Sequence, residues 1–281
     1  MSHNRDTGAA IKVAYLGPQG TYSQLAALDF FGEDVQLLAC TSIDDVFAAV
    51  ENEAASHGVV PVENSTEGAI NNTQDCLVDT PVHIIGEQIV SIEHSLLAQS
   101  GVSKPDIRKI ASHKQSLAQC RGYLARNFPK IELIECASNA QAAILAQTNS
   151  DTAAIASEIA GRVYDLQSLE ACIQDKSNNR TRFLVLAEGE TAPSGADKTS
   201  ILVYTENKPG ALFRVLEPFE KYQLSLTKIE TRPSKKEAWE YVFFIDFEGH
   251  VQDQATKKLF ETLERGGVVV KILGSYPICV Q

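Results

Sequence analysis

Two arginines flank a single hydroxyl in the stretch Asn179-Arg180-Thr181-Arg182-Phe183, and the apolar run Leu184-Val185-Leu186 follows at once. Two guanidinium groups beside the start of a buried strand need a negative partner, because an unpaired buried charge is strongly unfavourable. The stretch therefore predicts a site for a small anionic substrate that carries a hydroxyl to be protonated. A basic loop that only caps a strand is the alternative interpretation.

The composition is that of a globular protein with an acidic balance. The chain has 281 residues, of which 44% are hydrophobic and 22% charged, and this length allows two domains of common size. Its 25 Lys and Arg against 36 Asp and Glu give a net charge of −11. We expect no nucleic-acid partner, since that affinity comes mostly from neutralised phosphates. An anionic metabolite would need a locally positive pocket.

The sequence shows no pattern of a membrane span, a secretion signal or a metal site. No apolar run approaches the roughly 18 residues of a span, and the start of the chain lacks the apolar core of a signal peptide. The six histidines are dispersed, and the six cysteines show no C-x-x-C spacing. We expect a cytoplasmic protein without a membrane partner, with reduced thiols at Cys40, Cys76, Cys120, Cys136, Cys172 and Cys279.

Apolar runs alternate with helical patterns from residue 11 to residue 164. This alternation predicts an α/β layer architecture with mostly parallel sheets. The predicted strands cover residues 11–16, 59–62, 82–92, 110–112, 131–135 and 153–156. The predicted helices cover residues 25–31, 43–53, 69–77, 116–127, 139–147 and 157–164.

Three polar clusters fall where predicted strands lead into helices: residues 17–23, 63–68 and 112–120. In such sheets, ligands bind outside the carboxyl ends of the strands, so the clusters predict one shared site. The glycine turn and helix start of the first cluster would direct free N–H groups at an anion. It is not a dinucleotide fingerprint, because the third glycine and the downstream acid are missing.

The alternation of predicted strands and helices changes after a polar, Gly- and Pro-containing linker at residues 188–198. The order of elements beyond it is βαββαβ, which is typical of a ferredoxin-like sandwich. The predicted strands are residues 200–205, 224–230, 238–248 and 268–273, and the predicted helices are residues 210–222 and 253–265.

Six motifs in order give the chain a specific resemblance. It resembles prephenate dehydratase joined to a C-terminal ACT regulatory domain, over about residues 11–277. The motifs are Gly17-Pro18-Gln19-Gly20-Thr21-Tyr22-Ser23, Pro61-Val62-Glu63-Asn64-Ser65-x-Glu67-Gly68, Ser112-His113-x-Gln115 with Gln119-Cys120, Asn179-x-Thr181-Arg182-Phe183, Asn207-Lys208-Pro209-Gly210-Ala211-Leu212-Phe213 and Glu230-Thr231-Arg232-Pro233.

The resemblance implies a fold and its boundaries. The catalytic domain is expected at residues 11–188, as two α/β lobes that resemble periplasmic binding proteins. The first lobe would be residues 11–88 with 174–188, and the second residues 89–173. An α+β ferredoxin-like ACT domain is expected at residues 199–277.

The resemblance also implies a reaction, the decarboxylative dehydration of prephenate to phenylpyruvate in L-phenylalanine biosynthesis. Aromatisation of the ring drives this reaction, so no metal or redox cofactor is expected. Thr181 would assist the departing hydroxyl as a hydrogen-bond donor. Arg182 would hold a carboxylate through a bidentate pair, and Phe183 would pack on the substrate ring. The other implied substrate contacts are Thr21, Asn64, Ser65, Ser112 and Gln119.

The C-terminal motifs imply feedback inhibition by L-phenylalanine. ACT domains of this family bind the effector between paired domains, so a homodimer or homotetramer is expected. A glycine-led helix start suits the effector carboxylate. The effector residues implied by resemblance are Asn207, Gly210, Ala211, Leu212, Glu230 and Arg232.

Two other functions stay open from the sequence. Arogenate dehydratase performs the same chemistry on a substrate with an amino group, and the pocket motifs do not separate the two. A non-catalytic amino-acid-sensing binding protein is the second alternative, although a binder has no need of the Thr181 hydroxyl. Because few residues precede residue 11, a chorismate mutase domain is not expected.

Overall fold

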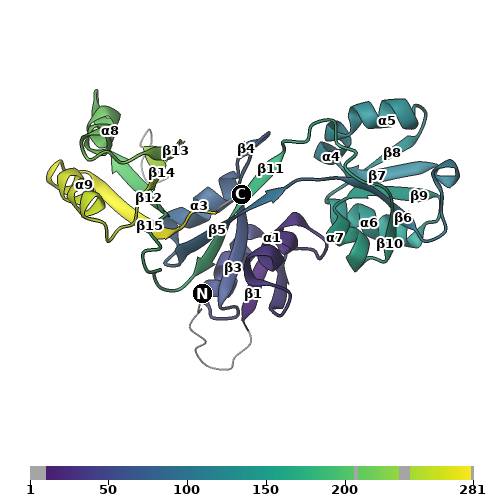
Figure 1. The fold of residues 1–281 in the computed structure, drawn as a ribbon, viewed down its shortest axis with the longest axis horizontal. Helices are drawn as coiled ribbons and strands as arrows, with labels where there is room; N and C mark the ends of the chain where they lie inside the picture. Colours follow the sequence, from purple (N-terminus) through teal and green to yellow (C-terminus); the bar gives the residue numbers. More distant parts are fainter. Residues whose placement is uncertain (1–10, 206–207, 234–240, 280–281) are drawn as a thin grey trace. The chain divides into compact units, whose positions relative to one another are not determined.

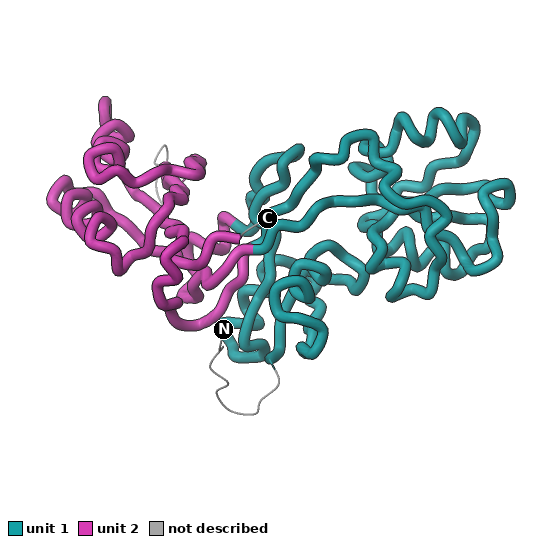
Figure 2. Tube along the Cα trace, in the orientation of Figure 1, with its two compact units in different colours: residues 1–73, 88–183 teal, residues 74–87, 184–281 magenta. Residues whose placement is uncertain are grey.

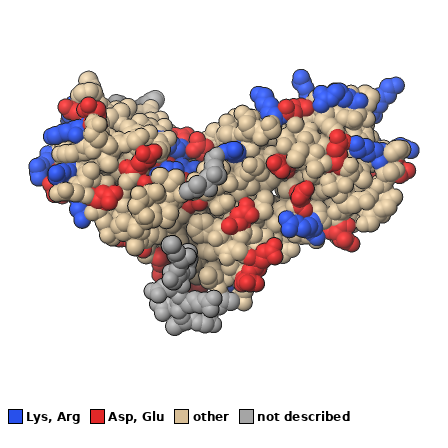
Figure 3. All heavy atoms as spheres, viewed as in Figure 1, with Lys and Arg blue, Asp and Glu red and all other residues tan. Residues whose placement is uncertain are grey.

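The computed structural model describes residues 11–205, 208–233 and 241–279. Their strands form three sheets, each covered by helices (Figure 1). No helix in these ranges is long and apolar enough to cross a membrane. Acidic side chains are spread over the face drawn in Figure 3, with basic ones among them.

The first sheet has the strand order β2-β1-β3-β11-β5, with β4 paired to β3. Its inner strands are apolar on both faces, as the wholly buried Val13, Ala14, Val59 and Val60 show, and this is typical of a sheet covered on both sides. The strands are β1 (Lys12–Leu16), β2 (Gln36–Cys40), β3 (His57–Asn64), β4 (Gly68–Ala69), β5 (His83–Ser91) and β11 (Arg180–Ala187); the helices are α1 (Tyr22–Phe31), α2 (Ile43–Glu51) and α3 (Asn71–Asp79).

The second sheet has the order β10-β6-β9-β7-β8 and forms the second lobe. Apolar clusters around Leu96, Ile110 and Ile155 on one side and Leu97 and the alanines of α6 on the other make its core. The strands are β6 (Ser95–Gln99), β7 (Lys109–His113), β8 (Glu132–Cys136), β9 (Thr152–Ala156) and β10 (Leu166–Glu170). The helices are η1 (Lys104–Asp106), α4 (Lys114–Gln119), α5 (Arg121–Asn127), α6 (Asn139–Thr148) and α7 (Glu158–Val163).

Both sheets are mixed, whereas the sequence predicts mostly parallel ones. Strand β6 pairs antiparallel with both β9 and β10, and the sequence pattern did not predict β6, β10 or β2. The helix predicted for residues 116–127 is also interrupted, because Cys120 ends α4 and precedes α5.

The third sheet is antiparallel with the order β13-β14-β12-β15, and the chain order βαββαβ confirms the predicted ferredoxin-like architecture. Its core joins Phe219 of α8 to Phe247 of β14 and Leu259 of α9. The elements are β12 (Asp197–Thr205), α8 (Ala211–Lys221), β13 (Leu226–Pro233), β14 (Tyr241–Glu248), α9 (Gln254–Arg265) and β15 (Val269–Pro277). The α/β fold class with a second α+β part is therefore confirmed.

The chain divides into two compact units (Figure 2). Unit 1 holds residues 1–73 and 88–183, and unit 2 holds residues 74–87 and 184–281. Most of α3 and the start of β5 thus group with the C-terminal sheet, whereas the sequence assigns residues up to 88 to the first lobe. The domain bounds 11–188 and 199–277 stay a prediction.

Polar contacts hold the parts of unit 2 together. The Lys271 ammonium donates to three carbonyl groups at the end of α3, those of Leu77, Val78 and Thr80, at 3.2, 2.8 and 2.7 Å. A cation at this position also suits the helix dipole. The Lys198 ammonium lies 2.9 and 2.8 Å from the two carboxylate oxygens of the buried Glu87.

Candidate active site

A cavity of about 390 Å³ lies within unit 1 and takes its walls from both lobes. This volume is within the range of small-molecule sites, roughly 300–1,000 Å³. Strand ends and helix starts supply the lining, as expected for an α/β sheet. The lining residues are Leu16, Thr21, Tyr22, Ser23, Pro61, Asn64, Glu67, Ile70, Ile92, His94, His113, Gln115, Ser116, Gln119, Ala137, Ser138, Asn139, Asn179, Thr181 and Phe183.

Three helices begin at this cavity. Thr21, His113 and Ser138 are the N-caps of α1, α4 and α6, and each accepts a hydrogen bond from a backbone N–H of its own first turn. The remaining N–H groups of a first turn carry a partial positive charge and favour an anion. Because the described lining contains no Lys or Arg, these helix starts are its main source of positive potential.

Thr181 lies on β11 and faces the cavity, with 7% of its surface exposed. The Asn64 side-chain amide donates to the Thr181 hydroxyl oxygen at 2.9 Å and to the Asn179 amide oxygen at 2.9 Å. Asn64 is the last residue of β3, and the turn after it is held to the start of β11 because the Ser65 N–H donates to the Arg180 carbonyl at 2.8 Å. The fold therefore brings together the second and fourth sequence motifs.

Arg182 is not among the lining residues. Successive side chains of a strand point to opposite faces, so Thr181 and Phe183 share one face of β11 and Arg180 and Arg182 the other. Burial follows this pattern, since Thr181 and Phe183 are buried, Arg180 is exposed and Arg182 half-buried. The structure thus does not place Thr181 between two guanidinium groups that face a common ligand.

Two more predicted contacts have structural partners instead of a place in the lining. Ser112 is wholly buried, and its hydroxyl lies 2.6 Å from the Ile155 carbonyl and 3.0 Å from the Asn139 amide oxygen. It therefore helps to place Asn139, which does line the cavity. The Ser65 hydroxyl oxygen accepts from the Arg180 N–H at 2.9 Å, so Ser65 fastens the turn to β11.

The other predicted contacts, Thr21, Gln119 and Phe183, all line the cavity. The Thr21 hydroxyl is also engaged at the start of α1, because it donates to the Leu16 carbonyl at 3.0 Å. Phe183 is 2% exposed and belongs to the core as well as to the cavity wall.

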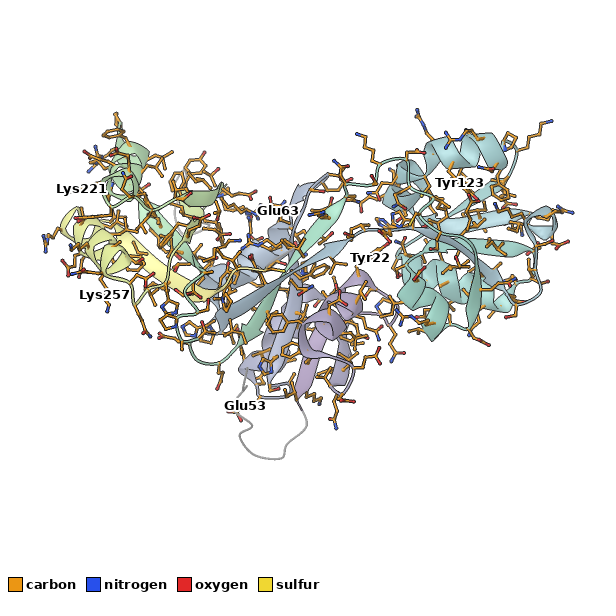
Figure 4. All side chains as sticks on the ribbon, in the orientation of Figure 1. Tyr22, Glu53, Glu63, Tyr123, Lys221 and Lys257 are labelled. Carbon is orange, nitrogen blue, oxygen red and sulfur yellow. The ribbon has the colours of Figure 1, made fainter. Side chains whose placement is uncertain are left out.

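Sequence reasoning did not assign a role to Tyr22, which Figure 4 labels, or to His94. Contacts of these two residues join the two lobes of unit 1. The Tyr22 hydroxyl donates to the Glu93 carbonyl and lies 3.1 Å from Nδ1 of His94. His94 Nε2 in turn lies 2.8 Å from the Gln119 amide oxygen. Burial lowers the pKa of His94, which the bond to Gln119 opposes, and burial raises the pKa of Tyr22. Both side chains are therefore neutral near pH 7.

Asn179 is a further lining residue without an assigned role. Its amide nitrogen is buried and has no hydrogen-bond partner among the described residues. A buried unpaired amide beside a cavity is a group that a ligand can satisfy. The motif Asn179-x-Thr181 contained the signal, but spacing alone does not show that the two residues share a wall.

The described residues contain no group of three or more His, Cys, Asp or Glu side chains that could hold a metal ion. The cavity chemistry is instead that of neutral donors and hydroxyls, with Glu67 as its acidic member. Such a lining can hold an anion, orient it and donate a hydrogen bond to a departing oxygen.

A second cavity, of about 220 Å³, lies in unit 2 at the start of α8. It is lined by Gly210, Ala211 and Leu212, together with Thr205, Lys208, Phe213, Tyr241 and Phe243. Gly210 has φ +77°, a left-handed conformation that suits glycine. Glu230 and Arg232 do not line it; Arg232 lies 2.6 Å from Asp75 in an ion pair. Asn207 lies outside the described residues.

Comparisons with known proteins give the family. The pattern of the prephenate dehydratase family matches residues 13–191, and that of the ACT domain matches residues 199–265. The chain is 46% identical to a bifunctional chorismate mutase/prephenate dehydratase of Aquifex aeolicus, over 95% of this chain and 74% of that protein. It is 35% identical to a prephenate dehydratase of Methanocaldococcus jannaschii, over 95% of this chain and 98% of that one.

A comparison with solved structures points to the same family as the sequence comparisons. The prephenate dehydratase of Arthrobacter aurescens in complex with L-Phe has a TM-score of 0.86 and 30% identity, over 95% of this chain and 90% of that one. The chain therefore belongs to the prephenate dehydratase family of carbon–oxygen lyases and carries an ACT domain after its catalytic part.

Proposed function

We propose that the cavity of unit 1 binds prephenate and that Thr181 assists loss of its ring hydroxyl. The observation that carries this proposal is the meeting of the Thr181 hydroxyl with three helix N-termini in one cavity. The helix starts suit the two carboxylates of the substrate, and the hydroxyl suits the group that leaves.

The reaction needs little from the protein beyond position and hydrogen bonding. The ring carbon–carboxylate bond breaks and releases carbon dioxide, and its electron pair enters the ring. The ring then expels the hydroxyl, whose oxygen keeps the carbon–oxygen pair and takes up one proton to leave as water. One proton is thus consumed for each phenylpyruvate, carbon dioxide and water that form.

Thr181 serves this step as a hydrogen-bond donor and not as a strong acid, because a threonine hydroxyl has no accessible pKa near neutrality. A donor placed where charge develops contributes roughly 2.7–4 kcal/mol of transition-state stabilisation. The low exposure of Thr181 strengthens that interaction, since few water molecules compete for it.

Carboxylate recognition is assigned to the starts of α1 and α6, not to Arg182. Both helices have 10 residues, and their first-turn N–H groups border the cavity next to Ser23 and Asn139. A helix N-terminus corresponds to about half a positive charge, so these two together can offset about half the charge of a dianion.

The cavity at the start of α8 is proposed as the site of L-phenylalanine. Its glycine-led helix start suits the effector carboxylate, and Phe213, Tyr241 and Phe243 suit the aromatic ring. We further propose a homodimer or homotetramer in the cytoplasm, with feedback inhibition that corresponds to about 1–3 kcal/mol of coupling.

The test is phenylpyruvate formation from prephenate by the purified chain, with and without L-phenylalanine, and with arogenate as a second substrate. Formation from prephenate that L-phenylalanine suppresses supports both proposals. Phenylalanine formed from arogenate at a higher kcat/KM would reassign the substrate. A thermal shift in L-phenylalanine without any turnover would favour the amino-acid sensor instead.

A further inference from the structure

The Asn64 side chain has only one possible orientation in this fold. Its amide oxygen accepts from two backbone donors, the Thr66 N–H at 2.9 Å and the Glu67 N–H at 3.1 Å. Backbone N–H groups cannot act as acceptors, so the opposite end of the Asn64 amide must be the NH₂ group. The turn after β3 therefore determines which way this amide points.

The NH₂ group of Asn64 has two hydrogens and two acceptors. One acceptor is the Asn179 amide oxygen and the other is the Thr181 hydroxyl oxygen, both at 2.9 Å. The Asn179 oxygen is held in place because it also accepts from the hydroxyls of Ser65 and Thr66, at 3.4 and 3.3 Å. Asn64 is thus fixed at both ends of its amide.

This arrangement determines the polarity of the catalytic hydroxyl. Because Thr181 accepts a hydrogen bond from Asn64, its own proton is not used in that contact. Among the described residues the Thr181 hydroxyl has no other hydrogen-bonding side chain, and Thr181 lines the cavity. Accepting a hydrogen bond also polarises the O–H group and strengthens it as a donor.

We propose that Asn64 is a positioning residue, which holds Thr181 as a donor toward the cavity, and that it is not chiefly a substrate contact. The proposal rests on the proposed function, in which the Thr181 proton meets the departing hydroxyl. It differs from the role implied by resemblance, because Asn64 then acts on the rate of the chemical step and not on substrate affinity.

The test is Asn64→Asp, which keeps the shape of the side chain and the oxygen that caps the Thr66 and Glu67 N–H groups. The second carboxylate oxygen can only accept, so it draws the Thr181 proton away from the substrate. We expect kcat near pH 8 to fall at least about 100-fold, the loss typical of one missing donor. The negative charge added to the cavity wall should also raise KM for the dianionic substrate, so the fall in kcat is the deciding readout.

The pH profile gives a readout that a merely structural role would not move. When the introduced carboxyl takes up a proton it can donate again, so kcat of Asn64→Asp should rise as the pH falls from about 8 toward 5. Wild type should lack this rise. Asn178→Asp is the charge control, because it adds the same charge near the turn on an exposed side chain, while only the main-chain carbonyl of Asn178 accepts from the Ser65 hydroxyl.

A double variant separates this proposal from its alternatives. If Asn64 acts through Thr181, Asn64→Asp should lower kcat no further in a Thr181→Val background, and the rise at low pH should vanish. Equal losses in both backgrounds would overturn the proposal, as would a KM effect without a kcat effect. Absence of phenylpyruvate with the wild-type chain would instead overturn the proposed function itself. Unfolding temperatures of the variants verify that each is folded.

Discussion

Replacement of Thr181 by valine removes the hydroxyl that we propose assists the reaction and keeps the shape of the side chain. The proposed hydrogen bond to the departing oxygen forms chiefly in the transition state, so its loss should lower kcat and leave KM nearly unchanged. A lost donor of roughly 2.7–4 kcal/mol corresponds to a fall in kcat of about 10²- to 10³-fold. Thr181→Ser, which keeps the hydroxyl, should stay within about tenfold of wild type.

The structure also predicts how much less stable the folded state of Thr181→Val is than that of wild type. The Asn64 NH₂ group loses one of its two acceptors but keeps the Asn179 oxygen at 2.9 Å. A partly unsatisfied buried donor costs about 1–3 kcal/mol, so the variant should unfold at a lower temperature while it remains folded at 25 °C. The fall in rate is then a property of the folded enzyme.

The assay is the initial rate of phenylpyruvate formation over a range of prephenate concentrations, so that kcat and KM are obtained separately. Thermal unfolding of the same preparations supplies the control. A Thr181→Val enzyme within tenfold of wild-type kcat would refute the role of this hydroxyl. A rise in KM at constant kcat would show that Thr181 binds the ground state and transition state equally.

Three other perturbations test the structure. Arg182→Ala should change KM less than about threefold, because Arg182 lies on the face of β11 opposite to Thr181. If Arg182 instead held a substrate carboxylate in a buried bidentate pair, binding assays would show that the variant loses about 2 kcal/mol or more of substrate binding free energy. Lys198→Met should lower the free energy of unfolding by about 3–5 kcal/mol in urea titrations, because it leaves the buried Glu87 carboxylate without its ammonium partner. The double variant Lys198→Met with Glu87→Leu should recover much of that loss, because it removes the buried charge as well. Burial lowers the pKa of His94 below 6.5, so the unfolded chain binds a proton that the folded chain does not, and stability should fall as the pH drops below 6.5. His94→Gln should make that fall shallower in urea titrations at several pH values, and an unchanged slope would contradict the burial argument.

The arrangement of strands and helices was predictable where local patterns are strong. The glycine turn before Tyr22 lies at a strand-to-helix junction, as predicted, whereas the polar turn after β3 leads first into the two-residue strand β4 and only then into α3. The carboxyl ends of strands meet at one edge, so these junctions share a cavity. The βαββαβ order of the last third was predictable for the same reason, because each element has its own apolar period.

The missed elements are short strands whose neighbours come from distant parts of the chain. β6 and β10 have five residues each, and β10 has the mixed sequence LQSLE. Their antiparallel pairing depends on where the chain returns, which no local pattern encodes. His94 was missed likewise, since its contacts with Tyr22 and Gln119 join residues 72 and 25 positions apart.

The motif around Thr181 shows how composition and geometry can point in different directions. In the sequence, two arginines flank one hydroxyl, and this order predicts a cationic site for an anion. In the structure, residues 180–183 belong to β11 and alternate between its two faces, so Thr181 is on one face and both arginines are on the other.

If the cavity binds prephenate as proposed, its affinity for this anion comes from backbone dipoles, which no count of charged residues records. A chain with net charge −11 can hold a dianion in this way without a lysine or arginine among the described lining residues. Holding the substrate by neutral donors, and not by a cation, also affects the rate of decarboxylation. A cation bound to the carboxylate that departs as carbon dioxide would stabilise the ground state more than the transition state, because that charge moves into the ring as the bond breaks. In the proposed function, helix N-termini hold the substrate with less of this penalty because they carry no full charge, and the Thr181 hydroxyl acts where negative charge arrives.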